Sequence, residues 1–162
     1  MPTIKDVIGD VIKREGGSQV TNDPADGGGR TQYGISERAN PKAWADGKVT
    51  EDDARAIYEA KYVKGPHFDL VQDDQLRAQL VDFGVNSGPG IAIQKLQEIL
   101  RVDADGALGP QTLTALQQHR ADDINNQLVA ARIRMICRVV QKNPSQLKFL
   151  SGWASRSLDF LS

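Results

Sequence analysis

Residues 3–17 read TIKDVIGDVIKREGG, a pattern that predicts an amphipathic helix ending at a carboxylate and two glycines. The apolar residues follow the i, i+3, i+4, i+7, i+8 spacing of a single helical face: Ile4, Val7, Ile8, Val11 and Ile12. The pair Gly16-Gly17 stops the helix, because glycine readily adopts the backbone conformation that terminates one. We therefore expect a helix over residues 4–15.

Glu15, the last residue of this helix, is the leading candidate for a catalytic acid. The carbonyl end of a helix carries partial negative charge, which disfavours an ionised carboxylate, and a neighbouring apolar face adds desolvation. Both effects favour the protonated carboxyl that a general acid needs at neutral pH. Gly16 and Gly17 leave open space in which a substrate can approach. An exposed glutamate before an ordinary glycine stop is the alternative interpretation.

The segment after this helix, residues 18–35, is rich in Gly, Asp, Asn and Thr and has no helical period. Two pieces of it, residues 19–21 and 30–35, predict a short β-hairpin or an irregular loop. Either structure lets the chain fold back toward the end of the first helix. Polar side chains of this segment can therefore lie opposite Glu15.

Three side chains of this segment are candidates for a second catalytic group. Asp23, Asp26 and Thr31 lie 8, 11 and 16 residues after the glutamate at the helix end. Glycosidic cleavage uses one protonated carboxyl and a second group, which holds water or stabilises positive charge on the sugar. Which of the three faces Glu15 stays open; we assign Asp26 and Thr31 to catalysis and Asp23 to substrate binding. Turn formation is the alternative role for both aspartates.

The rest of the chain predicts helices separated by short turns, so the fold class is mainly α. These helices cover residues 50–62, 74–85, 91–101, 110–116, 122–142 and 147–161. Apolar residues on more than one side of 122–142 predict a central buried helix, with Cys137 inside it as an inert buried thiol. The turn at 86–90 is the best boundary, but it is too short for a flexible linker. We expect two lobes, 1–88 and 89–162, packed as one compact unit.

Composition excludes several classes of protein. The 162 residues include 20 basic and 21 acidic side chains, and the net charge of −1 gives no electrostatic footprint for nucleic acid. One cysteine excludes an internal disulfide, and with two histidines a His/Cys zinc site would need all three residues together. We expect neither a metal nor an organic cofactor. Residues 1–17 mix charged with apolar residues, unlike a signal peptide, so we expect a cytoplasmic protein that something else releases.

Ordered motifs run through nearly the whole chain. In the first half they are EGG at 15–17, NDPADGG at 22–28, TQYGI at 31–35, YEAKY at 58–62 and DFGVNSG at 82–88. In the second half they are KLQ at 95–97, DGALGPQT at 105–112 and FLSGWASR at 149–156. The first set resembles glycoside hydrolase family 108, whose members are phage and prophage lysozyme-like endolysins that act on peptidoglycan. The second set resembles the peptidoglycan-binding region usually joined to that family.

The resemblance implies a lysozyme-like helical fold, with a catalytic lobe at 1–88 and a helical peptidoglycan-binding lobe at 89–162. It implies an N-acetylmuramidase that hydrolyses the β-1,4 bond between N-acetylmuramic acid and N-acetylglucosamine, with Glu15 as the general acid. The expected partner is bacterial peptidoglycan. A separate pore-forming protein of the holin type is expected to release the monomeric enzyme from the cytoplasm of the bacterial host.

Three further residues are predicted to bind substrate: Tyr33, Tyr62 and Asn86. Asn86 ends a helix and can hydrogen-bond an N-acetyl group, although a helix-stop role explains it equally well. The chain departs from the family pattern at Val63, where the family has tryptophan. Tyr62 is therefore expected to supply aromatic surface for a sugar.

Residues of the second half have two interpretations each. Arg132, Arg134 and Arg138 predict a solvated or ion-paired helix face, with contact to peptidoglycan carboxylates or wall phosphates as the alternative. Trp153, at helical spacing, is expected to belong to the core rather than to a sugar platform. Two alternative functions also fit the whole sequence: a non-catalytic peptidoglycan-binding module, and a chitinase-like hydrolase that uses the same acid chemistry.

Overall fold

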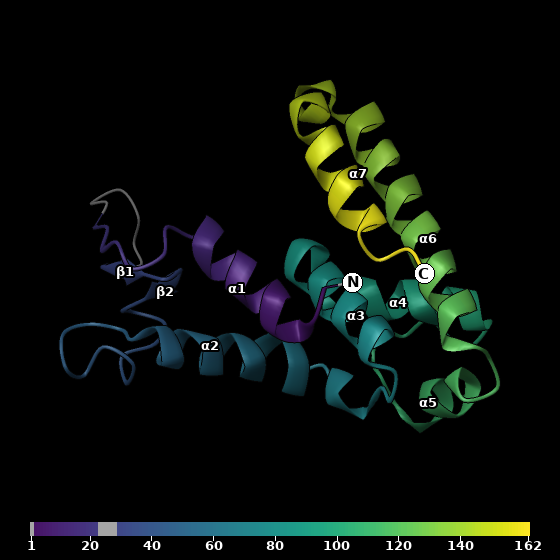
Figure 1. Cartoon of the computed structure of the whole chain (residues 1–162), viewed down its shortest axis with the longest axis horizontal. Helices are drawn as coiled ribbons and strands as arrows, with labels where there is room; N and C mark the ends of the chain where they lie inside the picture. The colour runs from purple at the N-terminus through teal and green to yellow at the C-terminus, as the bar shows by residue number, and fades with distance from the viewer. Residues whose placement is uncertain (1, 23–28) are drawn as a thin grey trace.

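The computed structural model describes residues 2–22 and 29–162, so the candidates Asp23 and Asp26 lie outside the described residues. The fold is mainly α with a small hairpin after the first helix, as the sequence predicts (Figure 1). In chain order the elements are α1 (Ile4–Arg14), β1 (Thr31–Gln32), β2 (Ile35–Ser36), α2 (Glu51–Glu59), a π-helical turn (Ala60–Lys64), a 3₁₀ turn (Phe68–Leu70), α3 (Asp74–Ser87), α4 (Pro89–Leu100), α5 (Pro110–Leu116), α6 (Ala121–Lys142), a second 3₁₀ segment (Pro144–Phe149) and α7 (Leu150–Leu158).

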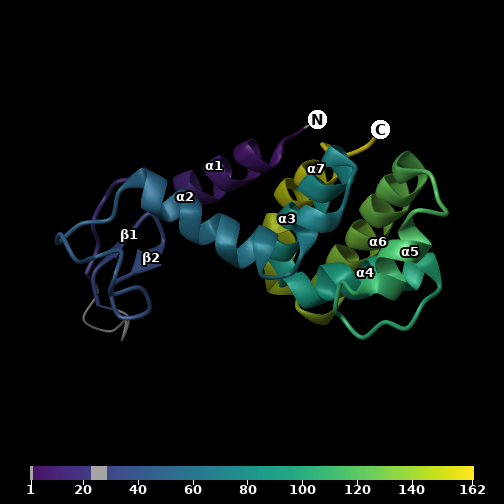
Figure 2. The same ribbon diagram turned by 90° about the horizontal axis from the view of Figure 1, so that it is seen from below.

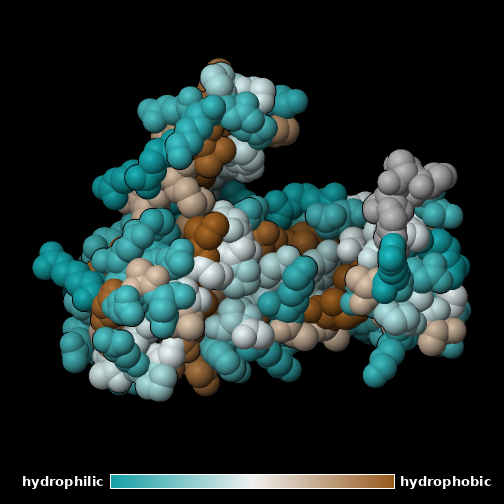
Figure 3. All heavy atoms as spheres, turned by 180° about the vertical axis from the view of Figure 1, so that it is seen from behind, coloured by the Kyte–Doolittle hydropathy of each residue, from teal (hydrophilic) through white to brown (hydrophobic). Residues whose placement is uncertain are grey.

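The helices form a long body with a projecting arm. Helices α1 and α2 run side by side toward one end, where they carry the β1–β2 hairpin (Figures 1 and 2). Helices α3, α4 and α5 build the opposite end together with the start of α6. The second half of α6 and all of α7 leave this end as an antiparallel pair. Seen from behind, a hollow separates this α6–α7 arm from the lobe that carries the hairpin (Figure 3).

Helices α1 and α2 both begin at capping boxes. The backbone N–H of Thr3 donates to Asp6 at 2.9 Å, and the Asp6 N–H donates back to the Thr3 hydroxyl at 3.2 Å. Thr50 and Asp53 repeat the arrangement at the start of α2, each at 3.1 Å. The backbone N–H and the hydroxyl of Thr3 lower the pKa of Asp6, and the hydroxyl and the backbone N–H of Thr50 lower the pKa of Asp53, because these donors stabilise the carboxylate form. The caps fix where α1 and α2 start.

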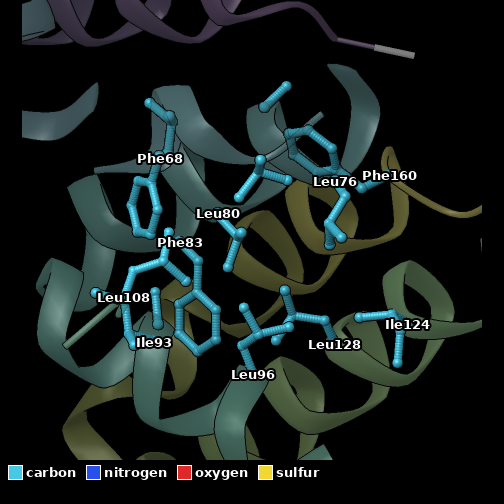
Figure 4. Packing of buried hydrophobic residues seen from close by; sticks show 14 of the residues in the cluster. Phe68, Leu76, Leu80, Phe83, Ile93, Leu96, Leu108, Ile124, Leu128 and Phe160 are labelled. Carbon is cyan, nitrogen blue, oxygen red and sulfur yellow. The ribbon is translucent and has the colours of Figure 1, made fainter. Parts of the chain in front are cut away.

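Helix α3 is the central helix of the fold. Its buried residues face all sides: Leu76, Ala78, Gln79, Leu80, Val81, Asp82, Phe83 and Gly84. Leu80 and Phe83 pack in one cluster with Leu96 of α4 and Leu128 of α6 (Figure 4). These four residues come from both predicted lobes, so the two lobes share one hydrophobic core. The division after residue 88 stays a prediction about the function of each lobe.

The prediction of a central buried helix is wrong for α6 beyond its middle. Its buried residues end at Ile136, and Cys137, predicted to be buried, is exposed. Of the apolar residues in this second half, Ile133 and Met135 pack against the core from partly buried positions, whereas Val139 is 41% exposed. Although α6 has 22 residues, neither it nor another helix in the described part of the chain is apolar enough to cross a membrane.

Candidate active site

The Glu15-Gly16-Gly17 motif forms a Schellman cap at the end of α1. The Gly17 N–H donates to the Ile12 carbonyl at 3.0 Å, and the Gly16 N–H donates to the Lys13 carbonyl at 3.3 Å. Gly16 has a φ of +91°, in the left-handed region that favours glycine. The two glycines therefore turn the chain sharply directly after Glu15, which is the C-cap residue of α1. Among the described residues no atom lies within 4 Å of a Cβ added at either glycine, which agrees with the open space predicted there.

The hairpin is tied to the loop that follows Glu15. The Tyr33 N–H donates to the Gly17 carbonyl at 2.9 Å, and the Gln32 side-chain amide donates to the Ser18 carbonyl at 2.9 Å. Tyr33 and Gly34 form a two-residue turn with φ values of +53° and +75°, the signature of a type I′ hairpin turn. The hydrogen bonds hold Tyr33 in a conformation that is unfavourable for a residue with a side chain.

Tyr58 closes the other side of this turn. Its hydroxyl donates to the Tyr33 carbonyl at 3.1 Å, and its side chain is almost fully buried. Burial and the negative charge of Glu15 raise the pKa of Tyr58 to about 12, so the hydroxyl keeps its proton at physiological pH. Gly34 lies between Glu15 and Tyr58, and no side chain fits between them.

Glu15 lines a groove of about 430 Å³ between α1, the hairpin and α2. Polar and aromatic groups from three segments share this groove with it: Ser36, Asn40, Tyr58, Lys61 and Tyr62. Tyr58 and Tyr62 stack with ring centroids 6.1 Å apart, and the Lys61 ammonium lies 5.1 Å from the centre of the Tyr62 ring. The groove thus combines an aromatic wall, hydrogen-bonding groups and a carboxyl, as carbohydrate sites require.

A π-helical turn positions the aromatic wall. Helix α2 ends at Glu59, and the chain continues over Ala60–Lys64 with π-helical pitch. This wider turn presents both Lys61 and Tyr62 to the groove while Val63 stays in the core. Turns of this kind occur preferentially at functional sites. Because Val63 is buried, the family's tryptophan at this position would be a packing residue here rather than a sugar platform.

Glu15 is exposed to solvent at the wall of the groove. Among the described residues that line the groove it is the single carboxylate. Its location beside a hollow that is open to solvent allows a substrate oxygen to reach it. The Glu15 side chain can therefore exchange a proton with a bound ligand. A second catalytic carboxylate would have to come from a segment other than those that line the groove.

The predicted site residues fall into three groups. Glu15 and Tyr62 meet in the groove, and Tyr33 lies next to it, with its backbone carbonyl bound to Tyr58. Thr31 pairs with Thr21 through two backbone hydrogen bonds and does not line the groove. Asn86 does not line it either.

The Asn86 amide donates to the Asp82 carbonyl at 2.6 Å, on the last turn of α3. This bond fits the helix-stop role that the sequence also allows. Neighbouring Val85 lines the groove instead, and Asn86 borders a second pocket on the other side of the helix end. The assignment of Asn86 to substrate binding stays a prediction.

Four polar or aromatic groove residues are absent from the predicted site: Ser36, Asn40, Tyr58 and Lys61. Tyr58 stands four residues before Tyr62, and this spacing puts the two side chains on one helical face. The sequence could therefore have indicated Tyr58 as a site residue. Ser36 and Asn40 come from the end of the hairpin and the loop after it. The Asn40 amide donates to the Ser36 carbonyl at 3.3 Å. No sequence motif places that loop beside α1.

Comparison with known proteins agrees with this architecture. The pattern described as glycosyl hydrolase 108 matches residues 8–88, and a predicted peptidoglycan domain matches residues 91–158. The structure of Brucella abortus SagA is 30% identical in sequence, covers 97% of this chain and 94% of its own, and superposes with a TM-score of 0.63. A search of curated proteins found no match. The mainly α, lysozyme-like fold is confirmed, and the chain belongs to glycosyl hydrolase family 108.

Proposed function

We propose that the protein is an N-acetylmuramidase with Glu15 as its general acid. Membership of the family makes the protein a glycoside hydrolase that acts on peptidoglycan. The proposal adds the bond: the β-1,4 linkage that joins the anomeric carbon of N-acetylmuramic acid to N-acetylglucosamine. The observation that carries it is the place of Glu15 in a groove walled by Tyr62 and bordered by hydrogen-bonding side chains.

In the proposed reaction the Glu15 carboxyl donates its proton to the glycosidic oxygen. The C–O bond to the muramic acid breaks, and positive charge develops on that sugar ring. Water then adds to the anomeric carbon, and the proton it loses goes to a base. Tyr62 supports a sugar ring by stacking. The base or charge-stabilising group is one of Asp23, Asp26 and Thr31.

Product analysis tests the bond assignment. Purified peptidoglycan is digested with the protein, the fragments are reduced with borohydride, and their masses and reduced ends are determined. The proposal predicts reduced N-acetylmuramic acid at the new ends. Reduced N-acetylglucosamine would show cleavage of the other glycosidic bond, new amino termini would show an amidase, and cleavage of chitin oligomers at a comparable rate would show a chitinase-like specificity. Binding of peptidoglycan without any cleavage would show that the protein is a non-catalytic wall-binding module.

We also propose the biological setting of an endolysin. The protein acts as a monomer on the cell wall of a bacterial host after a holin-type protein opens the inner membrane. Coexpression with and without a holin tests this setting. Cell lysis that requires both proteins is the expected result, and lysis by the chain alone would contradict it.

A further inference from the structure

A second pocket lies between the end of α3 and the α6–α7 arm. It has a volume of about 200 Å³ and is walled mainly by apolar side chains, among them Met135, Ile136, Val139 and Trp153. Arg132 and Arg156 contribute the charged part of the wall. We call it the arginine pocket. Its volume lies below the range of about 300–1,000 Å³ that is usual for drug-sized ligands, so it suits a small fragment of a larger molecule.

The two arginines share one buried carboxylate. Asp82 is 1% exposed; one of its oxygens accepts from Arg132 Nη2 at 2.6 Å and the other accepts from Arg156 Nε at 2.6 Å. Arg132 is 3% exposed, and its Nη1 has no hydrogen-bond partner among the described residues. Two guanidinium groups thus face one carboxylate, which leaves a net positive charge. Of the two expectations for this helix face, Arg132 fulfils the ion-paired one and not the solvated one.

A third cation lies close to this cluster. Burial and the charge of Arg156 lower the pKa of Arg14, the last residue of α1. Asp82, Asp10 and Glu15 act on Arg14 in the opposite direction, so Arg14 lies within electrostatic range of both Asp82 and Arg156.

Consecutive residues at the last turn of α3 line the catalytic groove and the arginine pocket. Val85 lines the groove, whereas Asn86 and Ser87 line the arginine pocket. One substrate molecule can therefore occupy both sites. In peptidoglycan the peptide stem branches from the lactyl group of the same sugar whose bond the proposed reaction breaks. A stem fragment therefore starts near the groove.

We propose that the arginine pocket binds a free carboxylate of the peptide stem. Guanidinium groups bind carboxylates through directed, charge-assisted hydrogen bonds, and the apolar wall accepts the aliphatic part of a stem residue. The net positive charge of the cluster of Asp82, Arg132 and Arg156 attracts such an anion. The inference rests on the proposed function, because a stem reaches this pocket only when its glycan lies in the groove.

Val139 offers a test that leaves the arginines untouched. It lines the arginine pocket, is 41% exposed and makes no contact with Asp82 that the structure records. Val139→Glu adds a negative charge there, and Val139→Gln adds the same shape without the charge. The two residues have similar helix propensities, so the pair isolates charge.

The first measurement is binding of muramyl dipeptide by calorimetry, with the fully amidated dipeptide and inorganic phosphate as the other probes. We expect the glutamate variant to bind the dipeptide at least about fivefold more weakly than the glutamine variant, because like charges repel across a small pocket. The amidated dipeptide should bind weakly to both variants. Equal affinity of the two variants, or phosphate binding as tight as dipeptide binding, would overturn the assignment.

The second measurement compares hydrolysis of intact peptidoglycan with hydrolysis of glycan strands whose stems have been removed. Val139→Glu should raise KM for the stem-bearing substrate relative to Val139→Gln and leave both variants equal on stem-free strands. Equal KM values on the stem-bearing substrate would refute the inference while the hydrolysis itself would support the proposed function. If the protein binds the dipeptide in a charge-dependent way but cleaves neither substrate, the assignment of the arginine pocket stands and the proposed muramidase activity is refuted.

Discussion

The backbone of Gly34 lies directly against the side chain of Glu15. A Cβ added at Gly34 would lie 2.8 Å from Glu15 Cβ and 2.9 Å from its Cγ, and it would also collide with the Tyr58 hydroxyl. The hairpin turn therefore sets the position of the proposed acid. It does so at a residue whose φ of +75° already favours glycine.

Gly34→Ala should lower both stability and activity. Gly47→Ala is the matched control, because Gly47 has a φ of +78° but no atom in the described part of the chain lies within 4 Å of a Cβ added there. The control should lose about 1–2 kcal/mol for the left-handed backbone alone. Gly34→Ala should lose more in urea unfolding and, because displaced catalytic groups lose effectiveness steeply, up to about 10²-fold in the rate of wall hydrolysis. Equal losses in the two variants would show that the close approach to Glu15 is unimportant.

Tyr58→Phe should destabilise the hairpin turn and change the alkaline limb of stability. Loss of the hydrogen bond to the Tyr33 carbonyl should cost about 0.5–1.5 kcal/mol at neutral pH. The folded pKa of about 12 exceeds the ordinary value of 10, so the native protein should lose stability as pH rises from 10 to 12. The Tyr58→Phe variant should lose less stability between pH 10 and pH 12. Parallel curves for the two proteins in urea titrations at each pH would contradict the raised pKa.

Tyr62 should contribute binding through its ring rather than its hydroxyl. The hydroxyl has no recorded partner in residues 2–22 and 29–162, whereas the ring lines the groove. Tyr62→Phe should keep wild-type KM, and Tyr62→Ala should raise KM about two- to tenfold, as expected for one aromatic stacking contact. Steady-state kinetics on soluble glycan strands measures both. A larger defect in Tyr62→Phe than in Tyr62→Ala would exclude the stacking role.

Asp82→Asn should destabilise the protein strongly. The change leaves two buried or half-buried arginines without their carboxylate, a loss of about 3–5 kcal/mol. Asp74→Asn is the control, because the Asp74–Arg77 ion pair spans 3.1 Å at an exposed position, and its loss should cost about 0–1 kcal/mol. Urea unfolding measures both. A small effect of Asp82→Asn would mean that the cluster does not hold α3 to the α6–α7 arm.

The positions of most helices follow from local patterns, because caps and turn residues mark their ends. The helices predicted to start at residues 4 and 50 start at Ile4 and Glu51, where the Thr3–Asp6 and Thr50–Asp53 pairs cap them. The packing of α6 could not be predicted in the same way. Its periodicity shows that several faces are apolar, but it does not show that the buried positions of α6 end at Ile136. Central α3 gave no clear amphipathic signal because it is buried on every side.

The residues of the candidate site could be predicted only where the sequence around them contains a recognisable local pattern. Glu15 stands out because a helix end and two glycines mark it, and Tyr62 because it is an aromatic residue in a matched motif. Asn40 reaches the groove through the tertiary path of a loop. Arg132 has the sequence pattern of a surface residue, and its burial depends on Asp82, which lies 50 residues away in the chain.

The rate of Glu15→Gln tests the central claim most directly. The change keeps the size of the side chain and removes the proton donor, so hydrolysis of purified peptidoglycan should fall by about 10²- to 10⁴-fold with unchanged thermal stability. Glu98→Gln is the matched control, because Glu98 is an exposed residue of α4 that pairs with Lys95 and does not line the groove. It should retain full activity. A Glu15→Gln protein that hydrolyses peptidoglycan at a rate close to the wild type would contradict the account.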